Sequence, residues 1–110
     1  MVEYSQSLDS LFYSLSDSTR RDILDRLTKN DLSVSEIALP YDMTLAAISK
    51  HLKVLERAKL IIRRKQGKQH IFQLYPPAFA DASEYISYYT NFWESNLDSL
   101  KSYLERNNDG

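Results

Sequence analysis

The sequence predicts a mainly α-helical domain that carries a small β-hairpin. Apolar residues recur at helical spacing in four segments before residue 60 and in one long segment after residue 77. Two short segments, 60–65 and 69–74, have the character of paired strands around a turn at Gln66-Gly67-Lys68. Glycine and proline number only 2 and 3, which favours long regular elements. We expect a single domain over residues 1–110.

Composition excludes several classes of protein. The chain has 110 residues, of which 43% are hydrophobic and 26% charged, so it can form a core. It has no cysteine, which excludes disulfides, thiolate zinc sites and a cysteine nucleophile. No apolar run reaches the ~18 residues of a membrane helix, and the N-terminus lacks a signal-peptide pattern. We therefore expect a cytoplasmic protein without a membrane partner.

Polar residues mark the starts of the first predicted helices. After a helix over 5–15, the segment Ser16-Asp17-Ser18 offers N-cap side chains for a helix over 18–28. Either Ser33 or Ser35 can cap a short third helix. That helix ends before Pro40, because the residue preceding a proline avoids the α conformation.

Thr44 is the expected N-cap of a fourth helix, which runs to about Ala58. The positions expected to face the core are Leu45, Ile48, Leu52 and Leu55. The opposite face carries Ala46, Ala47, Lys50, Lys53 and Arg57. Small residues at the start of a helix and cations along it suit the groove of a polyanion.

The order of these elements predicts a winged helix-turn-helix. The short helix, the turn and the helix from Thr44 form the helix-turn-helix, and the basic hairpin after them forms the wing. The motif occupies about residues 16–75. The helix over 5–15 and a long helix over 77–106 flank it.

Charge is distributed unevenly along the chain. Between Thr44 and His70 there are eight lysines and arginines and one acid, Glu56, so this segment carries +7. The remaining residues carry −8, which gives the formal net charge of −1. A basic segment that coincides with a helix-turn-helix and its wing indicates contact with nucleic acid.

Several separated segments resemble the ArsR-type (ArsR/SmtB-like) family of winged helix-turn-helix regulators. They are Ser16-Asp17-Ser18-Thr19-Arg20-Arg21-Asp22-Ile23-Leu24, Ser49-Lys50-His51-Leu52-Lys53-Val54-Leu55, Ala58-Lys59-Leu60-Ile61, Arg63-Arg64-Lys65 and Gly67-Lys68. The resemblance covers about Leu8 to Leu74. The chain departs from the family at Lys59, where glycine is usual, and at the turn Pro40-Tyr41-Asp42.

The resemblance implies a surface for double-stranded DNA, with the helix from Thr44 in the major groove and the wing at phosphates or the minor groove. The implied DNA-binding residues of the helix are Thr44, Ala46, Ala47, Ser49, Lys50, His51 and Lys53. Those of the wing are Arg63, Arg64, Lys65, Lys68 and Gln69.

The resemblance also implies a homodimer formed through the terminal helices. The expected interface residues are Leu8, Leu11, Phe12 and Leu15 with Tyr85, Tyr89, Phe92, Trp93, Leu97 and Leu100. A second interpretation, which overlaps with the first, is that some of these aromatic residues line a pocket for an apolar small-molecule effector.

The metal sites of the family lack their ligands here. Ser33 and Ser35 stand where thiolate sensors have a Cys-x-Cys pair, and hydroxyls do not replace thiolates toward soft metals. The last helix has only Asp81 and Glu84 as early carboxylates and has no histidine. We interpret His51 and His70 as packing or hydrogen-bonding residues, with His70 facing the body of the domain. We therefore expect neither a metal site nor a cofactor.

The sequence thus predicts a homodimeric, sequence-specific repressor of a pseudo-palindromic operator that does not respond to metals. The main alternative is a winged-helix module that binds an acidic protein. An enzyme is not expected, because the chain has no glycine-rich phosphate loop and no nucleophile beside a base. The acids Asp22 and Asp25 lie among Arg20, Arg21 and Arg26 and resemble surface ion pairs. The operator, the effector and the direction of regulation stay open.

Overall fold

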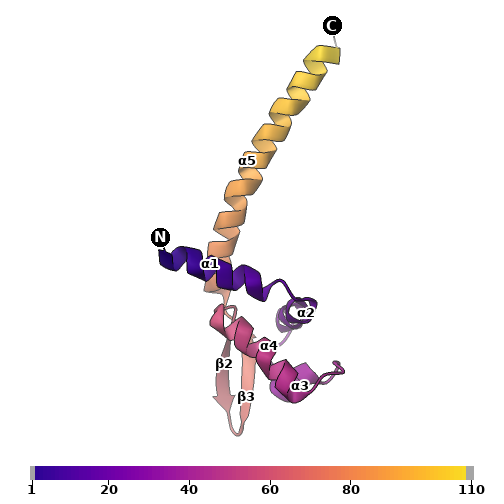
Figure 1. Cartoon of the computed structure of the whole chain (residues 1–110). Helices are drawn as coiled ribbons and strands as arrows, with labels where there is room; N and C mark the ends of the chain where they lie inside the picture. The colour runs from indigo at the N-terminus through magenta and orange to yellow at the C-terminus, as the bar shows by residue number, and fades with distance from the viewer. Residues whose placement is uncertain (1, 109–110) are drawn as a thin grey trace. The chain divides into compact units, whose positions relative to one another are not determined.

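The computed structural model describes the backbone of residues 2–108 and the side chains of residues 8–107. The chain forms two compact units, Met1–Phe79 and Ala80–Gly110. Helices and strands follow the order α1 (Val2–Ser14), α2 (Ser18–Leu27), β1 (Leu32–Ser33), α3 (Val34–Ala38), α4 (Leu45–Arg57), β2 (Ile61–Gln66), β3 (Gln69–Leu74) and α5 (Pro76–Asn108) (Figure 1). The predicted fold, mainly helical with a small antiparallel hairpin, is confirmed.

Polar side chains begin three of the helices, as predicted. The Asp17 carboxylate accepts a hydrogen bond from the Arg20 N–H and caps α2. Ser33, not Ser35, caps α3, and it forms a capping box in which its hydroxyl and the Glu36 carboxylate each accept a backbone N–H. Thr44 caps α4 through the Ala47 N–H.

A third strand joins the predicted hairpin. The sheet has the order β1-β3-β2, and β1 pairs Leu32 with Phe72 and Ser33 with Ile71. Strand β1 was not predicted, because its two residues are too few to show an alternating pattern. This strand brings the start of α3 to the sheet.

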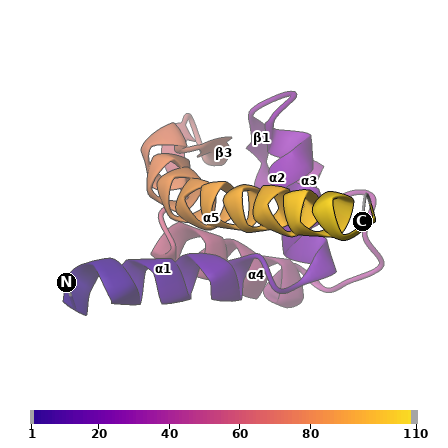
Figure 2. The same cartoon turned by 90° about the horizontal axis from the view of Figure 1, so that it is seen from above.

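The core of the first unit is formed by side chains from its helices and its sheet. Figure 2 shows α1 beside α4. The fully buried apolar side chains include Ile23, Ile37, Ile48, Leu55, Leu60, Ile61 and Phe72. Burial of these side chains stabilises the fold by roughly 2 kcal/mol each.

Two sequence-based expectations about side-chain direction were wrong. Leu45 is 62% exposed, because it is the first residue of α4 and lies a turn beyond Ile48, where the core contacts of this helix begin. His70 is exposed and pairs with Lys65 in the outer half of the hairpin. The buried residues of β3 are the next two, Ile71 and Phe72.

The second unit is the continuation of α5, which spans 33 residues in all, or about 50 Å of helix. Its large apolar side chains are exposed, among them Tyr85, Ile86, Tyr88, Tyr89, Phe92, Trp93, Leu97, Leu100, Tyr103 and Leu104. Neighbouring rings contact one another along the helix, with centroids of Tyr85 and Tyr89 5.0 Å apart. No helix within the described residues is both long enough and apolar enough to span a membrane.

Candidate nucleic-acid interface

Helix α4 presents small and basic side chains outward. Positions 46, 50, 53 and 57 recur at helical spacing and are all exposed, which places Ala46, Lys50, Lys53 and Arg57 on one face. Ile48, Leu52 and Leu55 occupy the buried side. Of the residues predicted for the outward face, Ala46, Lys50, Lys53 and Arg57 are exposed and Ala47 is half-buried.

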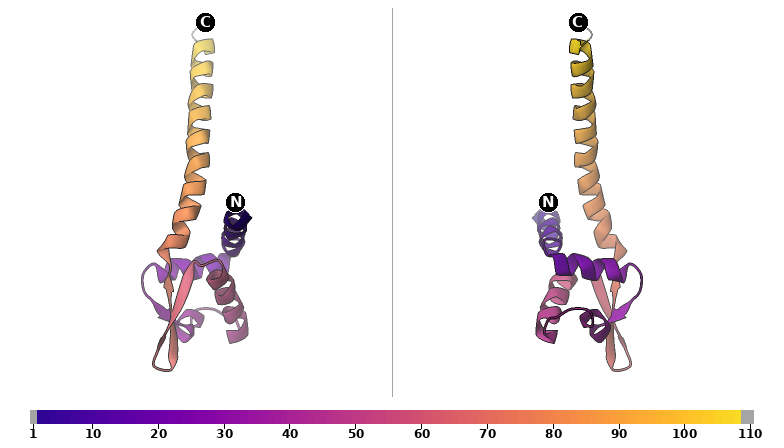
Figure 3. Two further views of the ribbon diagram at one scale, coloured as in Figure 1. Left: turned by 90° about the vertical axis from the view of Figure 1, so that its left-hand side faces the viewer. Right: turned by 90° about the vertical axis from the view of Figure 1, so that its right-hand side faces the viewer.

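The wing is a tight hairpin whose tip projects past α3 and α4 (Figure 3). Its two-residue loop is Gly67-Lys68, and Gly67 has a φ of 64°, which a residue with a Cβ rarely adopts. A positive φ at the first loop position alone is the pattern of a type II′ turn. The loop holds the Lys68 backbone at the outermost point of the wing.

Two arginines brace the base of the wing. Arg63 Nε lies 3.4 Å from Glu56 Oε2 of α4, and the guanidinium lies 5.9 Å from the centre of the Phe72 ring. Arg64 Nη1 lies 3.0 Å from Asp31 Oδ2 and also donates to the Gln73 side-chain oxygen. The Arg64–Asp31 pair is exposed, and in the other pair Arg63 is exposed while Glu56 is half-buried. Ion pairs of this kind are weak, so both arginines remain available to phosphates.

The lysines of this surface are not neutralised. Among the described side chains, no carboxylate lies within 4.0 Å of a lysine on α4 or the wing. Lys50, Lys53, Lys65 and Lys68 are all exposed. The +7 segment thus places exposed cations on both α4 and the hairpin, and we call these four lysines the basic surface.

His51 lies on a different side of α4 from these lysines. Its side chain is 20% exposed, and Nδ1 lies 3.3 Å from Nη1 of Arg20 and 3.8 Å from Oδ2 of Asp17. The Arg20 N–H bonded to the Asp17 carboxylate lowers the pKa of that group below its ordinary value, and nearby His51 acts in the same direction. His51 thus joins α4 to the start of α2.

Arg20 is not the surface residue that the sequence suggested. It is 7% exposed, and its guanidinium donates from Nε to the Ser14 carbonyl at 2.7 Å and from Nη2 to the Tyr13 carbonyl at 3.0 Å. It therefore satisfies two carbonyls at the end of α1 while it contacts His51. The segment Arg20-Arg21-Asp22-Ile23-Leu24-Asp25-Arg26 gives no sequence signal for which of its arginines is buried.

The turn between α3 and α4 is held from α2. Arg26 donates to the carbonyls of Ile37 and Glu36, both at 2.7 Å, and its guanidinium lies 5.4 Å from the Tyr41 ring centre. The Tyr41 hydroxyl donates to the Asp22 carboxylate, and burial together with this acceptor raises the tyrosine's pKa. The unusual Pro40-Tyr41-Asp42 turn is thus fixed on α2, which sets the direction of α4.

Helix α4 ends in a Schellman motif. Lys59 has a φ of 60°, its N–H bonds the Glu56 carbonyl, and the Leu60 N–H bonds the Leu55 carbonyl. Glycine is the residue best suited to this conformation, which accounts physically for the residue that the family usually has here. The motif leads the chain directly into the wing.

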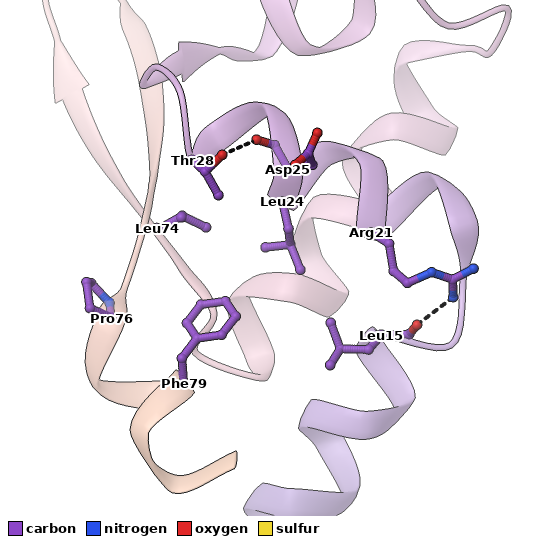
Figure 4. Close-up of a pocket in the computed structure, with 8 residues that line it drawn as sticks. All are labelled: Leu15, Arg21, Leu24, Asp25, Thr28, Leu74, Pro76 and Phe79. Carbon is purple, nitrogen blue, oxygen red and sulfur yellow. Dashed lines mark hydrogen bonds between the residues drawn. The ribbon is translucent and has the colours of Figure 1, made fainter. Parts of the chain in front are cut away.

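A separate apolar pocket of about 520 Å³ lies in the first unit (Figure 4). Its lining includes Leu15, Leu24, Leu74, Pro76 and Phe79, with the exposed residues Arg21, Asp25 and Thr28. Arg21 donates to the Leu15 carbonyl at 2.7 Å. None of the aromatic residues expected to line an effector pocket, from Tyr85 onward, contributes to its lining.

Ser33, at the position where thiolate sensors of the family have a cysteine, is the N-cap of α3. The Ser33 hydroxyl accepts the Glu36 N–H, so it serves the first turn of α3. Among the described side chains, no three histidine, aspartate or glutamate residues are grouped as metal ligands. Asp81 and Glu84 on α5 belong to no such group.

Comparison with known proteins identifies the same motif. A family model described as a helix-turn-helix domain matches residues 15–64. The HTH-type transcriptional regulator Rv2034 of Mycobacterium tuberculosis is 39% identical over 68% of this chain and 70% of its own length. The transcriptional repressor SdpR of Bacillus subtilis is 28% identical over 82% of this chain and all of its own length.

Solved structures agree with the sequence comparison. A crystal structure of an ArsR family transcriptional regulator superimposes with a TM-score of 0.77 at 33% identity, over 83% of this chain and 94% of the other. An ArsR-like transcriptional regulator from Rhodococcus sp. RHA1 gives 0.78 at 28% identity, over 96% of both chains. With this degree of identity and the helix-turn-helix and wing already described, the chain belongs to the ArsR family of DNA-binding transcriptional regulators.

Proposed function

We propose that this protein is a homodimeric, sequence-specific repressor that binds a pseudo-palindromic operator and does not respond to metals. The observation that carries the proposal is the basic surface, on which lysines of α4 and of the wing are exposed and lack carboxylate partners. Uncompensated cations on one surface supply affinity for phosphates. Relatives named as repressors support the direction of regulation.

In this proposal α4 enters the major groove and the wing contacts phosphates or the adjacent minor groove. The exposed starting residues Thr44, Leu45 and Ala46 approach base edges, followed by half-buried Ala47 and Ser49. Lys50 and Lys53 reach phosphates or guanine edges, and Arg63, Arg64, Lys65, Lys68 and Gln69 serve the wing. His51 lies on the side of α4 that faces Arg20, so in this proposal it supports the position of the helix through its contact with Arg20.

The exposed apolar residues of α5 support a homodimer. Ten large apolar side chains are exposed on α5, and a surface of this kind is typical of a protein interface. In a two-fold dimer the same helix of a second copy would pack against these side chains. Leu8 and Leu11 of α1 are already buried within the chain, so α5 would supply most of the interface. Two-fold symmetry then matches half-sites about one turn of DNA apart.

The proposed indifference to metals rests on ligand chemistry. Arsenical resistance operon repressors of Staphylococcus aureus and Escherichia coli are 32% and 37% identical to matched parts of this chain. This chain has no cysteine, and its Ser33 hydroxyl is already used by the α3 cap. Soft metals are poorly held by hydroxyl oxygens, so release from DNA by arsenite or zinc is not expected.

Fluorescence anisotropy tests the proposal directly. The protein is titrated against DNA from upstream of its own gene and against a scrambled duplex of equal composition, at two salt concentrations. Salt-sensitive binding that prefers the upstream duplex by a factor of ~1000 supports a specific regulator. Equal, weak binding to both duplexes would favour the protein-interaction module instead, if Lys50→Ala binds each duplex as well as wild type does. Sedimentation of wild type and Trp93→Glu tests the dimer.

The pocket of the first unit supports a second candidate, a repressor released by an apolar effector. Its lining is mainly leucine, proline and phenylalanine, with Arg21 and Asp25 as polar neighbours. Anilinonaphthalene sulfonate, an apolar anionic dye, is a suitable probe. Saturable fluorescence that is lost in Thr28→Trp would support a binding pocket, and unsaturable fluorescence would argue against it.

A further inference from the structure

The first turn of α4 exposes apolar side chains where a recognition helix meets base edges. Leu45, its first residue, is 62% exposed, and Ala46 after it is exposed as well. The first five residues of the helix are Leu45-Ala46-Ala47-Ile48-Ser49. None of them has the long hydrogen-bonding side chain with which proteins pair to guanine or adenine edges.

The apolar start of α4 lies next to the cations of the basic surface: Ala46 is on their face, and Leu45 is at nearly the same angle around the helix as Leu52 but one turn beyond the core. Leu45, Ser49 and Lys53 follow one another at four-residue intervals, and Ala46 and Lys50 form the adjacent row. A partner of this surface must therefore be anionic along the helix and apolar at its start. The major groove of DNA has both properties, because phosphates flank it and the 5-methyl group of thymine projects into it.

We propose that Leu45 is a specificity-determining residue that contacts thymine 5-methyl groups, with Ala46 beside it. The inference rests on the proposed function and adds to it the base that α4 selects. The operator then carries thymine under the start of each α4, and Lys50 and Lys53 hold the adjacent backbone. The Thr44 hydroxyl oxygen accepts the Ala47 N–H, so the O–H of Thr44 can donate to DNA while Leu45 and Ala46 supply the apolar contacts there.

The surrounding contacts favour this assignment over simple surface exposure of one leucine. The turn before α4 is held on α2, because Tyr41 of the turn contacts Asp22 and Arg26 of that helix. The start of α4 is therefore held in a fixed position. Ile48 and Leu52, one and two turns further along α4, anchor the helix in the core. Leu45 therefore approaches a partner on a preorganised helix, not on a loop.

Deoxyuridine isolates the contact, because it differs from thymidine only by the missing methyl group. Duplexes that wild-type protein selects from a random 30-base-pair library are made with thymidine or with deoxyuridine, and anisotropy gives both affinities. We expect wild type to bind the thymidine duplex about fourfold more tightly for each contacted methyl, so on the order of tenfold for a dimer. Leu45→Ala is expected to show a much smaller preference for thymidine, because only the shorter alanine side chains at positions 45 and 46 remain to contact the methyl.

Leu39→Ala is the matched control, because Leu39 is an 85% exposed leucine just after α3 and outside α4. It should keep the wild-type preference for thymidine. Equal binding of both duplexes by wild type would overturn the inference, as would an undiminished preference in Leu45→Ala or selected half-sites without thymine. Failure to select any duplex would overturn the proposed function, and this inference with it, before any deoxyuridine is used.

Discussion

Arg20 Nη1 lies 3.3 Å from Nδ1 of His51, and this contact joins the buried start of α2 to the middle of α4. An arginine is always protonated and can only donate, so any hydrogen bond in this contact runs from Arg20 to His51. Arg20 also donates to the carbonyls of Ser14 and Tyr13 at the end of α1. One guanidinium therefore connects three helices.

Replacing Arg20 should destabilise the fold much more than replacing its neighbour. Arg20→Ala leaves the buried Ser14 carbonyl and His51 without this donor and removes one of the donors to the Tyr13 carbonyl, which should lower the free energy of unfolding by about 2–3 kcal/mol. Arg21→Ala removes one exposed hydrogen bond to Leu15 and should cost less than about 1 kcal/mol. Urea unfolding at one protein concentration measures both, and equal losses would contradict the structural role of Arg20.

Lys59→Gly should stabilise the protein. Lys59 holds a φ of 60° in the Schellman motif after α4, a conformation that costs a residue with a Cβ about 1–2 kcal/mol. Glycine relieves this cost but adds freedom to the unfolded chain, so we expect a net gain of about 0.5–1 kcal/mol. Thermal unfolding checks the change, with Lys59→Ala as the control that keeps the Cβ and should gain nothing.

Local signals in the sequence were sufficient to predict most elements. The caps Asp17 and Thr44, the wing turn at Gly67 and the apolar stripe ending at Leu55 are set by nearby residues, and the structure has each where it was expected. The outward lysines of α4 follow from the same periodicity. The DNA contacts and the dimer remain predictions, because they depend on partners.

Features that depend on distant neighbours were not predictable. Strand β1 exists only because Leu32 and Ser33 meet β3. Arg20 is buried against the end of α1, where it donates to backbone carbonyls, while Arg21 beside it is exposed. Leu45 fits the helical period of the core, but the core contacts of α4 begin one turn later, at Ile48. Periodicity gives a residue's angle around a helix and does not give how far along the helix the core extends.

The Asp17 cap should contribute stability that depends on pH. Its pKa is lowered in the folded protein, chiefly by the Arg20 N–H, so the contribution is present above the unfolded pKa of about 3.9 and is lost as pH falls through the folded value. Asp17→Asn keeps a capping oxygen without the charge, and its stability difference from wild type should shrink below about pH 4. Urea unfolding from pH 3 to pH 7 measures this, with Asp98→Asn on α5 as an exposed control. A difference that stays constant with pH would contradict the assignment.

Lys68 tests whether the wing touches the DNA backbone. It lies in the two-residue loop at the tip, exposed and without a carboxylate partner among the described side chains. Each phosphate contact that a lysine makes contributes about 0.9 to the slope of log K against log salt, so Lys68→Ala should reduce that slope by about twice this amount in a dimer. Because a phosphate carries no sequence information, affinity should fall by the same factor for specific and scrambled duplexes. Lys101→Ala, which removes the same charge from α5, should leave the slope unchanged. If Lys68→Ala also leaves it unchanged, the tip of the wing does not contact phosphate, and the basic surface would have to act through α4 and the other cations of the wing.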